Sequence, residues 1–260
     1  MKSVFIVGSG KCGESFLNKI FKKNTYIECF DEKRPLLQAY YKFIKYNKLN
    51  IDEAPLFSAI DNSIKKSNRK KKIYLESSSY LIFHINELVN KFNSKIIILI
   101  RNPNHVSQSL NDSGWYNSVY KKSGSNKVLG YQGIATSFHN KHHNFSRIAP
   151  NGKYFFKWNK LNSIIKSKWY WDEVNKYLLK TVKKISKKKY KIFQIEKFNF
   201  ENYLEICKWL KVKPNLNTIQ FKFLVNIERI KKKKISQTNI NLLKKYKSNI
   251  EKQFYPENFK

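Results

Sequence analysis

The sequence predicts an α/β protein, a three-layer sandwich whose central parallel sheet is covered by helices on both faces. The first observation comes from the start of the chain, where an apolar run, residues 4–7, leads into three glycines and then into an amphipathic stretch. That order is typical of a strand, a tight loop and a helix. The second observation is residues 95–100, in which one lysine precedes five apolar residues, the pattern of a parallel strand buried on both faces. With 260 residues the chain can bury a sizeable core, and we expect one domain over residues 1–260.

The first loop, Gly8 to Gly13, has the composition of an anion-binding loop. Its glycines allow a tight turn in which backbone N–H groups and the positive end of the following helix converge on an anion. Lys11 adds a full positive charge. The loop differs from the Walker A loop of ATP-using enzymes, in which lysine and then serine or threonine follow the last glycine. Here Glu14 follows that glycine, and its carboxylate would repel an anionic ligand unless it points away or pairs with a lysine.

The second strand also ends in residues suited to phosphate. Arg101 follows it, and Ser109 comes eight residues later. Pro103 cannot continue strand pairing and suits the first turn of a helix, so we expect a helix that carries Ser109 back toward the strand end. A guanidinium and a hydroxyl that converge at the carboxyl edge of a strand can clamp a phosphate. An arginine that pairs with an acidic neighbour is the alternative interpretation.

Together the two segments resemble sulfotransferases that use 3′-phosphoadenosine-5′-phosphosulfate (PAPS), and among these the carbohydrate sulfotransferases. Residues 11–17, KCGESFL, follow the family's 5′-phosphosulfate loop, K-[SC]-G-T-T-x-L, with glutamate in place of the first threonine. Residues 101–103, RNP, followed by Ser109, match its 3′-phosphate motif. Weaker similarity over 73–81 and 190–210 extends the resemblance, which implies the P-loop NTPase-like fold of sulfotransferases. It also implies that the donor is bound by Gly10, Lys11, Cys12, Gly13, Glu14, Ser15, Phe16, Arg101 and Ser109.

The chemistry of sulfuryl transfer assigns further roles. Negative charge builds on the bridging oxygen of the donor as the bisphosphate leaves, and Lys11 is placed to neutralise it. The acceptor hydroxyl or amine must lose a proton to a base. Related carbohydrate sulfotransferases carry a glutamate or histidine base after the first helix, and residues 26–31, YIECFD, can be laid over that segment. The resemblance makes Glu28 or Asp31 the candidate base, with Glu76 behind them, although either could instead pair with a neighbouring lysine.

Cysteine usage and hydropathy indicate a cytoplasmic protein without a membrane span. The three cysteines, Cys12, Cys29 and Cys207, are few and scattered, which fits a reducing compartment better than a disulfide framework. No run reaches the roughly 20 apolar residues of a membrane span, and the first strand begins too soon after Met1 for a signal peptide. The helix dipole and the neighbouring lysine could lower the pKa of the Cys12 thiol, but a small residue filling a tight turn is the simpler interpretation.

The net charge of +34 suggests a polyanionic partner, such as nucleic acid. The lysines are spread over the whole chain, however, which indicates a compositional bias rather than a specific nucleic-acid site. One lysine run, 231–234, lies where the family has a basic loop over the 3′-phosphate of the donor. Residues 113–160 are rich in Gly, Ser, Asn and aromatic residues, and we expect them to shape the acceptor pocket. A long helix over 169–185 follows.

We expect no metal site, and sulfuryl transfer from PAPS requires none. Three histidines, at 139, 142 and 143, would share one helix face, but no carboxylate or cysteine stands at a ligand-like offset from them. The sequence thus predicts a PAPS-dependent sulfotransferase whose acceptor, a glycan or a small molecule, is not identified. Two alternatives stay open: a nucleotide kinase or other ATP-using P-loop enzyme, and a non-catalytic basic protein that binds nucleic acid.

Overall fold

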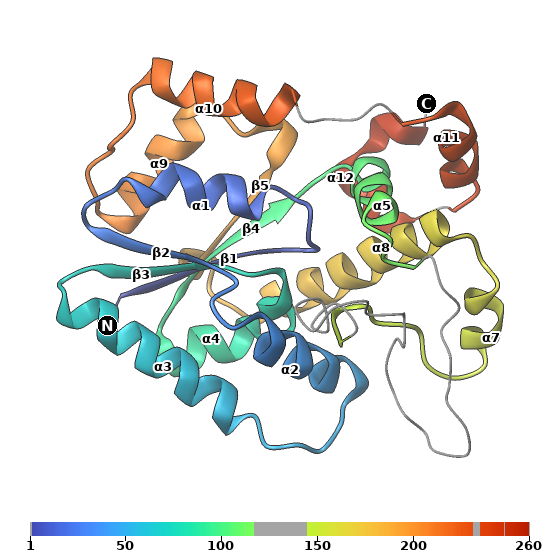
Figure 1. The fold of residues 1–260 in the computed structure, drawn as a ribbon, viewed down its shortest axis with the longest axis horizontal. Coiled ribbons are helices and arrows are strands. Elements are labelled where there is room, and N and C mark those ends of the chain that lie inside the picture. The colour runs from blue at the N-terminus through green and yellow to red at the C-terminus, as the bar shows by residue number, and fades with distance from the viewer. Residues whose placement is uncertain (1, 117–144, 231–234, 247, 260) are drawn as a thin grey trace.

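Five parallel strands form one sheet in the order β2-β3-β1-β4-β5. The strands are β1 (Ser3–Gly8), β2 (Ile27–Asp31), β3 (Ile73–Ser77), β4 (Lys95–Ile100) and β5 (Tyr190–Gln194). The computed structural model describes residues 2–116, 145–230, 235–246 and 248–259 (Figure 1), and for residues 227–230 the backbone alone. The α/β class with a parallel central sheet is confirmed.

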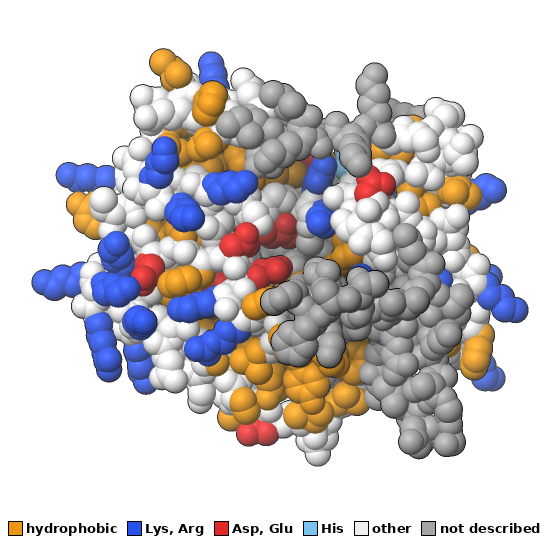
Figure 2. All heavy atoms as spheres, in the orientation of Figure 1, with side chains coloured by type: hydrophobic (Ala, Val, Ile, Leu, Met, Phe, Trp, Pro, Cys, Tyr) orange, Lys and Arg blue, Asp and Glu red, His pale blue; other side chains and the backbone are white. Residues whose placement is uncertain are grey.

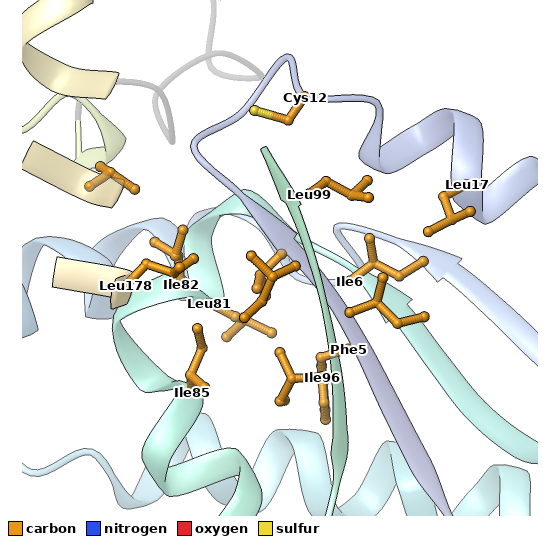
Figure 3. Close-up of a cluster of buried hydrophobic side chains, with 14 of the residues drawn as sticks. Phe5, Ile6, Cys12, Leu17, Leu81, Ile82, Ile85, Ile96, Leu99 and Leu178 are labelled. Atoms are coloured by element: carbon orange, nitrogen blue, oxygen red, sulfur yellow. The ribbon is translucent and has the colours of Figure 1, made fainter. Parts of the chain in front are cut away.

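Helices cover both faces of this sheet. On one face lie α1 (Glu14–Lys22), α9 (Phe200–Leu210) and α10 (Thr218–Ile230), and on the other lie α2 (Pro35–Asn47), α3 (Ala54–Arg69) and α4 (Ile85–Phe92) (Figure 1). The inner strands β1 and β4 are apolar on both faces because both faces are covered. Figure 3 shows the result: Phe5 and Ile96 lie with Leu81 on one side of the sheet, and Ile6 lies on the side of Leu17.

A group of helices lies beyond the carboxyl end of β4 (Figure 1). It contains α5 (Pro103–Asp112), α7 (Tyr154–Asn159), α8 (Ser163–Val182), α11 (Gln237–Lys244) and α12 (Asn249–Phe254). A buried ion pair, Lys168 to Glu251 at 2.7 Å, ties α8 to α12. The helix predicted from residue 169 begins six residues earlier because the side chain of Asn162 caps it, accepting a hydrogen bond from the N–H of Ile164 at 3.0 Å.

Short 3₁₀ helices complete the fold. They are η1 (Ser79–His84), η3 (Lys187–Lys189), η4 (Ile195–Lys197) and η5 (Pro256–Phe259). Within the described residues, no helix has both the length and the apolar character that crossing a membrane requires.

The strand order determines where a ligand can bind. The chain continues from β1 to β2 and β3 on one side of β1, and it then places β4 on the other side. In open parallel sheets, ligands bind beyond the carboxyl ends of the strands at such a change of direction. Here the loops after β1, β2, β3 and β4 meet at that edge.

Candidate active site

A cavity of about 580 Å³ opens at the carboxyl edge of the sheet. Its walls come from the loop after β1 and the first turns of α1, and from Arg101 after β4. Asp31 at the end of β2, Glu32 after it, and residues 77–80, which begin with the last residue of β3, form the rest. Trp115 contributes an aromatic wall. Figure 2 shows acidic side chains gathered in the hollow of this face, with lysine and arginine side chains around it.

The backbone of the first loop has the conformation that an anion-binding loop requires. Gly10 (φ 87°), Lys11 (φ 57°) and Gly13 (φ 99°) all adopt left-handed conformations, which turn successive N–H groups toward the inside of the loop. Glycine is required at position 13 on a second ground, because a Cβ there would lie 2.8 Å from Cγ1 of Ile195. The predicted strand, loop and helix are confirmed in this part of the chain.

Glu14 folds back into this loop. Its Oε1 accepts a hydrogen bond from the N–H of Gly10 at 3.1 Å, and its Oε2 accepts one from the N–H of Cys12 at 2.8 Å. The side chain is 8% exposed although Glu14 is the first residue of α1. Burial raises the pKa of this carboxyl, and the N–H groups of the loop oppose the rise. The loop N–H groups therefore hold a carboxylate that belongs to the chain itself.

Cys12 is a buried structural residue. Its side chain is fully buried, and its Sγ lies 3.1 Å from the hydroxyl of Ser9. Burial, with a further contribution from Glu14, raises the pKa of the thiol far above its usual range. The expectation that the pKa of the Cys12 thiol is lowered is therefore wrong. The simpler interpretation, a small residue that fills a tight turn, is supported.

Arg101 is brought to the first loop, as the sequence predicts. Its Nη1 donates a hydrogen bond to the carbonyl oxygen of Lys11 at 2.8 Å, and its own carbonyl accepts from Nε1 of Trp171 at 3.0 Å. Ser109 is half-buried in α5, and the cavity wall at that helix is formed by Leu110 and by Ser113, which follows its end. The structure thus unites the arginine with the loop but leaves Ser109 out of the cavity lining.

The three carboxylates considered as a base lie in different surroundings. Asp31 lines the cavity and accepts a hydrogen bond from the hydroxyl of Ser77 at 2.6 Å. Glu28 does not line it: its carboxylate accepts from Ser67 at 2.6 Å and from Lys70 at 2.7 Å on α3 and just past its end. These two donors lower the pKa of Glu28. Because Glu28 is bonded away from the cavity, the structure does not bring it to the candidate site.

Glu76 is likewise held away from the cavity. It is buried and accepts hydrogen bonds from the hydroxyl of Tyr74 at 2.5 Å, from Nε2 of Gln38 at 2.7 Å and from the N–H of Lys33 at 3.0 Å. Burial raises the pKa of its carboxyl. With these three donors Glu76 holds the end of β3 to the start of α2, which is a structural role.

Glu32 lines the cavity and was not singled out from the sequence. Its backbone is left-handed, with φ of 43°, and its N–H donates to the carbonyl of Ser77 at 2.8 Å. The hydroxyl of Ser79 approaches its Oε1 at 3.4 Å. Burial, with repulsion from Asp31 and Glu14, raises the pKa of Glu32 to about 7. Its position directly after a strand was the sequence feature that could have identified it.

A buried lysine lies behind this wall of the cavity. Lys42 on α2 is fully buried, and its Nζ donates to the hydroxyl of Tyr170 at 2.6 Å. Burial lowers the pKa of Lys42 to about 7, and attraction to Glu32 and Glu14 opposes that change. No carboxylate in the described part of the chain forms an ion pair with this ammonium group.

These features define an α/β protein with a glycine-rich loop after the first strand and an arginine at the end of the neighbouring strand. A family model described as the sulfotransferase domain matches residues 1–217. The chain belongs to the sulfotransferase family. No curated protein matches the sequence. The carbohydrate-type branch stays a prediction.

Solved structures are similar to the chain over nearly its whole length. The sulfotransferase domain from the curacin biosynthetic pathway has a TM-score of 0.50 at 11% identity, and the match covers 95% of this chain and 99% of that one. A sulfotransferase from Alicyclobacillus acidocaldarius has a TM-score of 0.47 at 14% identity, with 94% and 95% covered. At such identities the first of these likenesses shows the fold.

Some expectations fall on residues outside the described ranges. They are the three histidines at 139, 142 and 143, the lysine run 231–234 and most of the expected acceptor segment 113–160. Within the described residues, no three His, Cys, Asp or Glu side chains are grouped so that they could hold a metal ion.

Proposed function

We propose that the protein transfers a sulfuryl group from PAPS to a hydroxyl or amine acceptor. The observation that carries the proposal is the meeting, in one cavity, of the anion-binding loop with Lys11, Arg101 and two carboxylates. Membership of the sulfotransferase family supports it. The loop N–H groups suit the 5′-phosphosulfate, and the guanidinium beside the loop suits the 3′-phosphate.

Lys11 is the proposed leaving-group stabiliser. Its side chain is exposed to the cavity, and its left-handed backbone is fixed by the hydrogen bond from Arg101 to its carbonyl. A cation held at this point can neutralise the charge that develops on the bridging oxygen as the bisphosphate leaves. Because the two phosphate motifs are joined by that hydrogen bond, the positions of the two phosphates are coupled.

Glu32 is the proposed general base, with Asp31 as the second candidate. A base is most effective when its pKa lies near the working pH, and the pKa of Glu32 is about 7. Two features support a functional role for this residue: its left-handed backbone, which functional sites often retain, and its electrostatic interaction with the buried Lys42. While the lysine is protonated, its charge favours the ionised carboxylate.

The acceptor is proposed only as a class, a glycan or a small molecule that carries the hydroxyl or amine. No metal has a part in the proposed reaction. A cytoplasmic location is proposed because the three cysteines, at positions 12, 29 and 207, are free thiols, as is usual in a reducing compartment.

The test is isothermal titration with adenosine 3′,5′-bisphosphate and with adenosine 5′-phosphate. We expect the parent to prefer the bisphosphate. Arg101→Ala should cost roughly fiftyfold in affinity for it, because a charge-assisted clamp is worth about 2–3 kcal/mol. Affinity for the monophosphate should change little.

Arg69→Ala is the matched control, since Arg69 is an exposed arginine at the end of α3 that does not line the cavity. A parent without preference for the bisphosphate, or an Arg101 variant that loses both ligands equally, would contradict the proposal.

A further inference from the structure

The N–H groups of the anion-binding loop are engaged by Glu14. Its two carboxylate oxygens accept from Gly10 at 3.1 Å and from Cys12 at 2.8 Å, and its own N–H also favours the charged carboxylate. In a loop of this type, these are the groups that face a bound phosphate. One set of N–H groups cannot serve the carboxylate and a ligand anion at the same time.

The position of this carboxylate is restricted on several sides. A Cβ added to Gly8 would lie 2.5 Å from Oε1 of Glu14, so the carboxylate packs against the end of β1. The titratable groups that interact with it are Cys12 in the loop, Asp31 at the end of β2 and Glu32 after it, Lys42 on α2 and Tyr170 on α8.

Most of these neighbouring groups disfavour a negative charge on Glu14. Asp31 and Glu32 repel the carboxylate, and Lys42 is the cation among these neighbours, with no ion-paired carboxylate in the described part of the chain. Burial also disfavours the ionised form of Glu14. The loop N–H groups are therefore the chief interactions that keep this charge inside the protein, and removing them favours either protonation or movement of the side chain.

We propose that Glu14 is an internal competitor of the sulfuryl donor, whose carboxylate occupies the loop N–H groups until the donor's phosphosulfate displaces it. The inference rests on the proposed function, because it takes the donor as the displacing anion. It makes Glu14 a determinant of donor affinity, in place of the stabilising contact that a threonine would provide at this position.

A dependence on pH follows from the competition. The ionised carboxylate competes for the N–H groups, and the protonated carboxyl competes weakly. Donor affinity should therefore fall as the pH rises through the pKa of Glu14, which burial raises. By linkage, binding should take up at most about one proton at this residue.

The experiment is isothermal titration of the full chain at about pH 5.5 and about pH 8.5, so that the protonated form of a carboxyl with a raised pKa is more populated at the lower pH. The two probes are adenosine 3′,5′-bisphosphate and inorganic pyrophosphate. The variants are Glu14→Gln, which keeps the shape, and Glu14→Ala, which empties the position. Glu28→Gln is the matched control, because it removes a carboxylate bonded outside the cavity. Thermal melts establish that each variant is folded.

We expect both Glu14 variants to bind the bisphosphate at least about tenfold more tightly than the parent at high pH, the order of one charge-assisted contact. The gain should shrink at low pH and be absent in Glu28→Gln. Equal affinities in parent and variants, a gain independent of pH, or weaker binding by Glu14→Ala would overturn the inference. If the variants gain affinity for pyrophosphate alone, the loop is blocked by Glu14 but the proposed donor is wrong. If neither probe binds any variant, both proposals fail.

Discussion

Replacing Glu32 with glutamine should make the protein more stable at alkaline pH. The folded protein raises the pKa of this carboxyl from 4.5 to about 7, so the native state prefers the protonated form. A group whose pKa is raised on folding contributes stability below its unfolded pKa, and that contribution is lost as the pH rises through the folded value. Glutamine resembles the protonated carboxyl and keeps the same backbone, so the comparison isolates the charge.

The size of the effect follows from the same pKa change. A rise in the pKa from 4.5 to about 7 lowers the free energy of unfolding by at most roughly 3 kcal/mol once the carboxyl is fully ionised. In a chain of this size, removing that cost should raise the melting temperature of the variant by about 5 to 10 °C. At pH 8 the pKa of Lys42, about 7, is also exceeded, so the charge of this lysine, and with it its attraction to Glu32, is reduced there.

Thermal melts of Glu32→Gln and the parent between about pH 5 and about pH 8 span the window set by the raised pKa. Glu28→Gln is a control of opposite sign. Ser67 and Lys70 lower the pKa of Glu28, so this carboxylate contributes stability above its unfolded pKa that is lost as the pH falls. The control should be less stable than the parent at pH 8 and should approach it in acid.

The reasoning is refuted if Glu32→Gln melts at or below the parent temperature at pH 8. It is also refuted if the variant keeps the same advantage at pH 5, because a gain that does not vary with pH cannot come from the carboxyl charge. Either result would remove the physical ground for Glu32 as the base.

Three further expectations concern the same cavity. Lys11→Ala should lower turnover by roughly two to three orders of magnitude, the cost of one donor to a developing oxyanion, with an unchanged melting temperature; turnover within a few-fold of the parent would exclude this lysine as leaving-group stabiliser. Ser109→Ala should weaken bisphosphate binding much less than Arg101→Ala, because Ser109 is not in the cavity lining; equal losses in titration would contradict that placement. Lys42→Met should stabilise the chain more in acid than at alkaline pH, because burial lowers the pKa of this lysine and its charge is costly only while it is protonated. Lys45→Met on the same helix breaks partly buried ion pairs and should destabilise the chain; denaturant titration compares the two.

The sheet and both phosphate segments were predictable because their determinants are local. A β-branched run before a glycine loop, and another before Arg101, specify strands that end at one edge of a parallel sheet. The left-handed conformations at Gly10 and Gly13 are those that glycine favours. The resemblance to the family, rather than these local features, implied that the two segments bind one ligand, and the structure joins them through Arg101 and the carbonyl of Lys11.

The proposed base could not be predicted in the same way, because strand register determines which carboxylates reach the cavity. Glu28 lies within β2 and bonds to Ser67 and Lys70, whereas Glu32 follows the strand and turns into the cavity. A resemblance laid over residues 26–31 stops one residue short of it. The burial of Lys42 could not be predicted from the sequence either, because the hydroxyl to which it donates belongs to Tyr170, 128 residues further along the chain.

The charge distribution shows why the overall charge was a poor guide to this site. A chain with net charge +34 attracts anions from solution over its whole surface, so encounter with an anionic donor needs no further local charge. The cavity, however, is lined by carboxylates as well as by cations. The carboxylates are those of Glu14, Asp31 and Glu32, and the cations are those of Lys11, Lys19 and Arg101. The proposal for Glu14 therefore predicts that local affinity depends on which carboxylates are protonated and which N–H groups are free, and not on the number of lysines. Under the proposal for Glu14, a higher local concentration of anions at the surface of the protein would offset part of the weaker binding at the loop.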